Sequence, residues 1–158
     1  MITTLGQPIG ELEFSLTGNR RACLSDFRGR NLVLYFYPKA STPGCTQEGQ
    51  DFRDAFADFT GLDTAILGVS RDSIKAQENF RAKLGFPFDL VADTDEALCR
   101  LFDVIKLKKM YGRESLGVER STFLIDSEGV LRREWRNVKV KGHVQAVLDA
   151  THELQAGL

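Results

Sequence analysis

The sequence predicts an α/β fold with a mixed central sheet flanked by helices, because short apolar runs alternate with helical patterns along the chain. Residues 31–37 (NLVLYFY) and 64–70 (TAILGVS) are continuous apolar runs, which is typical of central strands buried on both faces. Residues 121–126 (STFLID) and 130–135 (VLRREW) flank a short turn that contains glycine, so we expect a β-hairpin at one end of the sheet.

A second, smaller hairpin is predicted near the N-terminus. There residues 11–16 (ELEFSL) and 21–24 (RACL) flank the turn sequence Thr17-Gly18-Asn19. The two units of strand and helix in the middle of the chain predict a mixed α/β sheet, with hairpin strands at one or both of its ends.

Four helices are expected from apolar residues that recur at one-face spacing. One follows Cys45, and another covers residues 73–84. A third begins at Asp93, where Asp93 and Glu96 could form a capping box, and the last begins at about His143.

The chain has 158 residues with no linker or repeat, so we expect one domain over positions 1–158. Apolar residues make up 42% and charged residues 27%, as in an ordinary soluble globular protein. The net charge of −1 gives no reason to expect nucleic acid or an anionic membrane as a partner. No apolar run approaches the roughly 20 residues that span a bilayer, and the N-terminus lacks the pattern of a secretory signal.

The three cysteines, Cys23, Cys45 and Cys99, form neither a Cys-x-x-Cys pair nor a zinc spacing. Since the chain also has only two histidines, we expect no metal site and no cofactor. So few cysteines fit a reducing cytosol, and a cytoplasmic location is expected.

A basic run contains Lys106, Lys108, Lys109 and Arg113. We interpret it as a solvated loop rather than a docking patch, because runs of charge are usually solvated.

Cys45 has the most informative surroundings. A buried strand ends at Pro38, and a loop containing Pro43 and Gly44 leads into an amphipathic helix, which places Cys45 in or just before the first helical turn. Unpaired N–H groups and the positive end of the helix dipole favour an anion there, and the thiolate is the nucleophilic form of cysteine. Thr42 adds a hydroxyl three residues upstream that can bind a small oxygen ligand.

The alternative for any cysteine is that it is a small buried residue. We favour that interpretation for Cys23, in a short strand pattern, and for Cys99, on an apolar helix face. For Cys45 the polar Ser, Thr, Pro and Gly neighbours argue against it.

Arg120 stands immediately before the strand at residues 121–126. If that strand lies beside the first central strand, its guanidinium could stabilise the Cys45 thiolate and the oxygen charge that leaves it. Glu48, one helical turn after Cys45, could hold Arg120 in place, although a surface position is the default for a helical carboxylate.

These stretches resemble a known family. Residues 38–45 (PKASTPGC) resemble the peroxiredoxin signature, in which a proline and a threonine precede the peroxidatic cysteine at fixed distances. Residues 35–48 and 108–126 are similar to the bacterioferritin comigratory protein subfamily, and the resemblance extends from about residue 9 to residue 148. It implies a thioredoxin-like fold with an added N-terminal β-hairpin.

The resemblance also implies an activity and its residues. The chain would be a thiol-dependent peroxidase that reduces hydrogen peroxide and organic hydroperoxides and becomes a sulfenic acid at Cys45. Thr42 would bind the peroxide, Pro38 would line the pocket, Arg120 would be the active-site arginine, and Glu48 would orient that arginine.

The chain departs from the subfamily at one position. Many members carry a resolving cysteine five residues after the peroxidatic one, where this chain has Gln50. We therefore expect a one-cysteine cycle, in which thioredoxin, glutaredoxin or glutathione reduces oxidised Cys45. The alternative is an atypical two-cysteine cycle resolved by Cys99. We expect the protein to be a monomer or a homodimer.

Three other functions compete with a peroxidase. A thioredoxin-like thiol-disulfide oxidoreductase would want a second cysteine where Thr42 stands. A cysteine hydrolase would need a histidine beside Cys45, yet His143 and His152 both lie near the C-terminus. A redox-silent binding module would be expected to lack Cys45 or Thr42.

Overall fold

A computed structural model of the chain describes residues 2–157. Within them, a seven-stranded sheet has the strand order β2-β1-β5-β4-β3-β8-β9, and β6 and β7 form a separate two-stranded ribbon. The elements in chain order are β1 (Glu13–Leu16), β2 (Arg20–Cys23), the 3₁₀ helix η1 (Leu24–Phe27), β3 (Asn31–Phe36), α1 (Pro43–Gly61), β4 (Thr64–Ser70), α2 (Ile74–Leu84), β5 (Asp89–Ala92), α3 (Ala97–Leu101), β6 (Ile105–Met110), β7 (Arg113–Val118), β8 (Ser121–Ile125), β9 (Leu131–Trp135) and α4 (His143–Gln155).

The sheet is mixed, as the sequence predicts. β3, β4 and β5 run parallel to one another, whereas β8 joins β3, and β1 joins β5, in antiparallel pairs. The predicted hairpins are β1–β2 and β8–β9, and both form with antiparallel register. β5 was not expected, because its four residues become a strand by pairing between β4 and β1.

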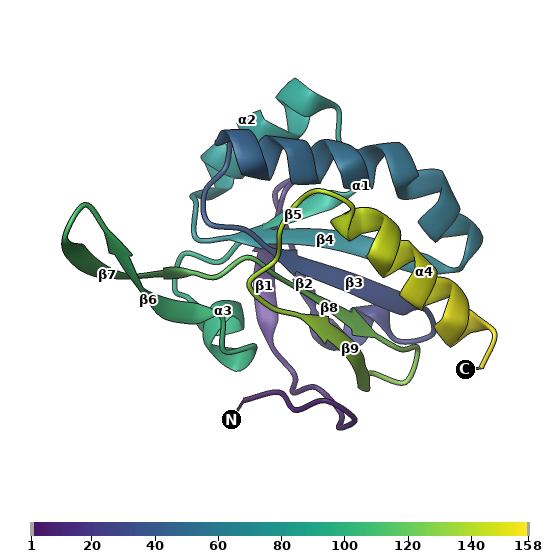
Figure 1. Cartoon of the computed structure of the whole chain (residues 1–158). Helices are drawn as coiled ribbons and strands as arrows, with labels where there is room; N and C mark the ends of the chain where they lie inside the picture. The colour runs from purple at the N-terminus through teal and green to yellow at the C-terminus, as the bar shows by residue number, and fades with distance from the viewer. Residues whose placement is uncertain (1, 158) are drawn as a thin grey trace.

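The sheet separates two hydrophobic cores. Side chains alternate between the two faces of a strand, and every residue of β3 is buried. Val33 and Tyr35 face a core shared with α1, α2 and α4, while Leu32 and Leu34 face a core shared with α3. Figure 1 shows α1 and α4 side by side over the sheet, and the ribbon β6–β7 extending away from it.

Three of the four predicted helices begin within two residues of where they are expected. Ser73 caps α2 by accepting the N–H of Ala76, and Gly85 ends it in the left-handed conformation at φ 63°. α4 begins at His143, and α1 contains Cys45 in its first turn.

The third helix differs from the prediction. α3 begins at Ala97 rather than at Asp93, and no capping box forms between Asp93 and Glu96. The Asp93 carboxylate instead accepts the N–H groups of Leu98 and Cys99. Glu96 cannot close the box, because it has a left-handed φ of 63° and its carboxylate pairs with two arginines.

The basic run is a ribbon, so its interpretation as a loop was wrong. Lys106, Lys108 and Lys109 lie on β6, and Arg113 begins β7. Lys108 donates to the Val118 carbonyl at 2.6 Å. Alternating side chains let these lysines reach solvent or a ribbon carbonyl while the two backbones pair.

The part of the chain between residues 2 and 157 has no helix long and apolar enough to cross a membrane.

Candidate active site

The first turn of α1 positions Cys45. Thr42 is the N-cap residue of this helix and Pro43 is its first residue, so Cys45 is the third helical residue. The preceding loop is held by Asp72, whose carboxylate accepts the Ala40 N–H at 2.8 Å. The Cys45 side chain is 1% exposed and joins the core on the α1 side of the sheet.

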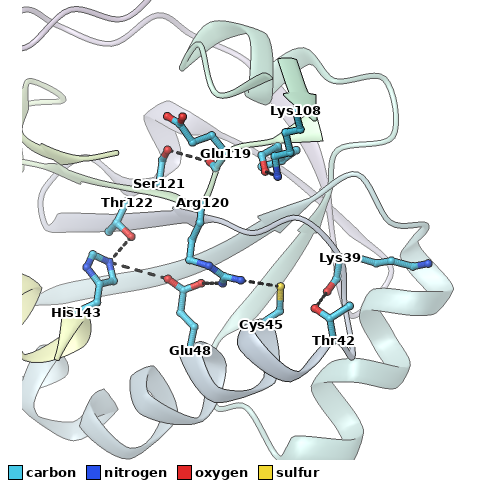
Figure 2. Close-up of polar contacts among 11 residues, drawn as sticks. Lys39, Thr42, Cys45, Glu48, Lys108, Glu119, Arg120, Ser121, Thr122 and His143 are labelled. Carbon is cyan, nitrogen blue, oxygen red and sulfur yellow. Dashed lines mark hydrogen bonds and ion pairs between the residues drawn. The ribbon is translucent and has the colours of Figure 1, made fainter. Parts of the chain in front are cut away.

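Thr42 and Pro38 flank this turn. The Thr42 hydroxyl donates to the Lys39 carbonyl at 2.7 Å, so it is directed back into the loop, as Figure 2 shows. Pro38 is half-buried just after β3. Both residues lie within the loop that leads into the Cys45 turn, where the sequence analysis expected them.

Arg120 reaches Cys45 because of the strand order. β8 pairs with β3, with Ser121 opposite Phe36, so Arg120 lies just beyond the end of β3 and next to the start of α1. Its Nη2 lies 3.5 Å from Cys45 Sγ (Figure 2). Burial works against the guanidinium charge, but Glu48 and Cys45 outweigh it and raise the pKa of Arg120. The site therefore keeps a permanent cation against the sulfur.

Glu48 holds Arg120 from the other side. Its Oε1 accepts from Arg120 Nη1 at 2.6 Å, and the carboxylate is fully buried. The default surface position was therefore wrong, because the α1 face that carries Glu48 turns toward the sheet. Burial raises the pKa of Glu48 to about 7, although Arg120 lowers it.

Gly44 keeps the approach of Arg120 open. A Cβ at position 44 would lie 3.1 Å from Arg120 Nη2, closer than side chains normally pack. Any side chain here, one position before the nucleophile, would therefore press on the Arg120 guanidinium.

Thr122 and His143 were missed by the sequence analysis as site residues. Alternation along β8 puts Thr122 on the same face as Arg120, and its Oγ1 lies 2.7 Å from Nε2 of His143. The same His143 nitrogen is 4.0 Å from Glu48 Oε2. No local pattern could have shown that Thr122 and His143 lie near Glu48, because the sheet order brings them together. The one available signal was that His143 stands where the predicted last helix begins.

Cys99 and Cys23 lie elsewhere. Cys99 is fully buried in the core on the α3 side of the sheet, and burial, with Asp93 beside it, raises the pKa of its thiol. Cys23 ends β2 and is half-buried, so its predicted place in the core was wrong. Burial and the nearby Asp26 raise its pKa too.

Nothing in the described range 2–157 gathers three or more His, Cys, Asp or Glu side chains that could hold a metal ion. The polar groups around Cys45 are instead one arginine, one carboxylate and hydroxyl or backbone groups, which suit a small oxygen ligand beside a thiolate.

A thiol at a helix start with a guanidinium against it, on a sheet of this topology, is the arrangement of a thiol-dependent peroxidase. The model of the AhpC/TSA family matches residues 5–134, and the chain belongs to that family, the peroxiredoxins. Its fold is accordingly thioredoxin-like.

Its relatives identify the subfamily within the peroxiredoxins. The chain is 56% identical to peroxiredoxin Bcp of Xanthomonas campestris over 89% of this chain and 88% of that protein. It is 47% identical to peroxiredoxin Bcp of Bacillus subtilis, with 98% of each chain covered. A solved structure of the Xanthomonas campestris bacterioferritin comigratory protein is 54% identical, with a TM-score of 0.88 over 91% of this chain and 92% of that one. The resemblance to this subfamily is thereby confirmed.

Proposed function

We propose that this peroxiredoxin reduces hydrogen peroxide and organic hydroperoxides with the thiolate of Cys45. The observation that carries the proposal is the contact of 3.5 Å between Arg120 Nη2 and Cys45 Sγ at the first turn of α1. A guanidinium and a helix N-terminus both stabilise a thiolate, which is the form that attacks peroxides.

The reaction balances as a two-electron transfer. The sulfur lone pair attacks one peroxide oxygen in line with the O–O bond, which breaks, and the S–O bond of a sulfenic acid forms. The other oxygen leaves with the electron pair and is protonated to water or an alcohol. Arg120 and the N–H groups of the first turn of α1 stabilise the departing charge. In this scheme Thr42 turns its hydroxyl from the Lys39 carbonyl to the bound peroxide.

A relative of this chain supports organic hydroperoxides as substrates. The Xanthomonas campestris bacterioferritin comigratory protein has an alkyl peroxide reduction activity, and it is 54% identical to this chain. Half-buried Pro38 and Ala40 beside the Cys45 loop would offer an alkyl group apolar contact.

We further propose that an external thiol, such as thioredoxin, glutaredoxin or glutathione, reduces the sulfenic acid. Cys45 and Cys99 join different cores, on opposite faces of the sheet. A disulfide needs Cα atoms within roughly 7 Å and converging Cβ atoms, so this pair would have to unfold locally to join. The three cysteines are free in the structure, which supports a reducing, cytoplasmic setting.

Peptide mapping tests the one-cysteine cycle. After one equivalent of peroxide without added thiol, we expect Cys45 as sulfenic acid, and excess peroxide should carry it to sulfinic acid. A dominant peptide that joins Cys45 to Cys99 would show instead the two-cysteine cycle. If peroxide oxidised no cysteine at all, the peroxidase assignment itself would fail.

A further inference from the structure

Glu48 carries an unsatisfied oxygen. Oε1 is bonded to Arg120, but Oε2 is buried with no hydrogen-bond partner among residues 2–157. A bare carboxylate oxygen in a protein interior is costly, so a proton or a cation nearby stabilises it.

His143 is the group that faces this oxygen. Its Nε2 is 4.0 Å from Glu48 Oε2 and 2.7 Å from Thr122 Oγ1, as Figure 2 shows. The rings of Phe52 and Trp135 stand edge-on to the imidazole and keep it in place. The imidazole of His143 is therefore a titratable base that lies in a packed position next to the Glu48 carboxylate, on the side away from Arg120.

We propose that Glu48 and His143, with Thr122 fixing the imidazole, share one proton-binding site, and that its proton determines how much of the Arg120 charge remains free to stabilise the Cys45 thiolate. His143 and Thr122 are then positioning residues that act through Glu48 and Arg120. The effect on catalysis rests on the proposed peroxidase function, whereas the shared proton does not.

The charge balance explains the effect. With one proton, the pair is neutral, and the positive charge of Arg120 is left for the sulfur and the departing oxygen. Without it, the pair carries one negative charge, which offsets the guanidinium. Burial raises the pKa of Glu48 to about 7 and lowers that of His143 to about 4, so one proton resides on the pair between these values.

The other charged or titratable groups that face the pair are few. Arg120 lowers the pKa of both partners, and Asp51, one turn further along α1, raises that of Glu48. The guanidinium of Arg120 contacts both Glu48 and the sulfur of Cys45. Tyr35, from β3, stays protonated because burial raises its pKa well above its ordinary value.

Oxidation of Cys45 should have a specific pH profile. As the pH rises through about 7, the pair loses its proton. The rate constant for oxidation of Cys45, corrected for the fraction of thiolate, should then fall, but by less than the roughly 10²-fold that complete removal of one such donor costs. His143→Gln and Thr122→Val should move this fall to another pH, since each disturbs the imidazole that shares the proton.

Nitrogen NMR tests the pair directly, because the chain has two histidines. In the wild-type protein the ring signal of His143 should show two steps with pH. One is the titration of His143 itself, and the other lies near pH 7, where Glu48 ionises. Glu48→Gln should remove that step and leave the signal of exposed His152 unchanged. A His143 signal with one step, the same in both proteins, would overturn the proposal.

Asp51→Asn tests the shared proton without changing Glu48 or His143. Asp51→Asn removes a charge that raises the pKa of Glu48, so the extra His143 step should move to lower pH. Asp58→Asn, an exposed carboxylate further along α1, is the matched control and should leave the step in place. A step that does not move in Asp51→Asn would contradict the assignment to Glu48. Peroxide oxidation of Cys45, measured separately, shows whether the proposed function fails instead.

Discussion

Cys45 and Cys99 occupy the same position in two helices. Each is the third helical residue, of α1 and of α3, and each is buried. By helix geometry alone, both thiols lie where unpaired N–H groups and the helix dipole favour an anion. The two sites should therefore be equally reactive if helix position were enough.

Their neighbours are opposite in charge. Cys45 has the guanidinium of Arg120 against its sulfur, whereas the N–H of Cys99 is taken up by the carboxylate of Asp93. Burial, together with that carboxylate, raises the pKa of the Cys99 thiol. The difference teaches that a helix start offers an anion site, and that the charge of the side chain facing the sulfur decides whether a thiolate occupies it.

Exchange of each cysteine for serine is the strongest test of this comparison. Cys45→Ser should lose peroxide reduction down to the rate of the buffer, because the nucleophile is gone. Cys99→Ser should keep single-turnover peroxide kinetics near the wild-type rate. Rapid peroxide reduction by Cys45→Ser would place the chemistry at another residue.

Arg120→Ala should have the next largest effect. Removing one donor to a developing oxygen charge typically costs on the order of 10²–10³ in rate. Stopped-flow oxidation of Cys45 measures this, with far-ultraviolet circular dichroism to show that the fold is kept. Arg100→Ala, which removes an exposed arginine paired with Glu96, is the control and should react normally. A wild-type rate in Arg120→Ala would mean that helix position suffices after all.

Asp93→Asn changes the other half of the comparison. It removes a charge that raises the pKa of Cys99, so that pKa should fall, while burial, its larger cause, keeps it above the ordinary value. The change should also destabilise the protein by about 1 kcal/mol, because an amide keeps one acceptor oxygen and the buried N–H of Leu98 or Cys99 then loses its partner. The pH dependence of Cys99 alkylation, followed by mass spectrometry, measures the pKa. Fast peroxide oxidation of Cys99 in this variant would show that Arg120 has no special role.

The smallest net effect is expected in the wild-type protein, where two pH slopes in stability oppose each other. Glu48 has a raised pKa, so the folded protein holds its proton longer than the unfolded chain, and its contribution falls as the pH rises from about 4.5 to about 7. His143 has a lowered pKa, so its contribution rises with pH between about 4 and 6.5. Each slope is at most about 1.4 kcal/mol per pH unit.

Two variants separate these slopes in urea unfolding at several pH values. In Glu48→Gln only the contribution of His143 remains, so stability should rise with pH more steeply than in the wild-type protein. In His143→Gln only the contribution of Glu48 remains, so stability should fall with pH. Slopes of the same sign in both variants would contradict the opposite shifts of the two pKa values.

Much of the fold follows from local patterns. β3 and β4 are continuous apolar runs, both hairpins have turn residues between their strands, and Ser73 and Gly85 bound α2 as caps should. β5 escaped prediction because its four residues become a strand by pairing between β4 and β1. The ribbon β6–β7 escaped prediction because its charged residues suggested a loop, whereas cross-strand pairing stabilises it.

What the sequence determined by itself was the place of the thiol. The loop with Pro43 and Gly44 before an amphipathic helix is a local feature, and it defines the first turn in which Cys45 lies. Family resemblance then gave roles to Thr42 and Arg120 without showing how they meet.

Only the tertiary structure decided which core each buried thiol joins, and that Arg120 faces Cys45. Arg120 is 75 residues from Cys45 in the chain, and it arrives because β8 pairs with β3. The same sheet puts Cys99 in the opposite core, whereas Asp93, which accepts its N–H, is only 6 residues away in the chain. The physical reason is that dipoles and caps act within a helical turn, whereas burial and the charges that face a side chain depend on elements distant in sequence.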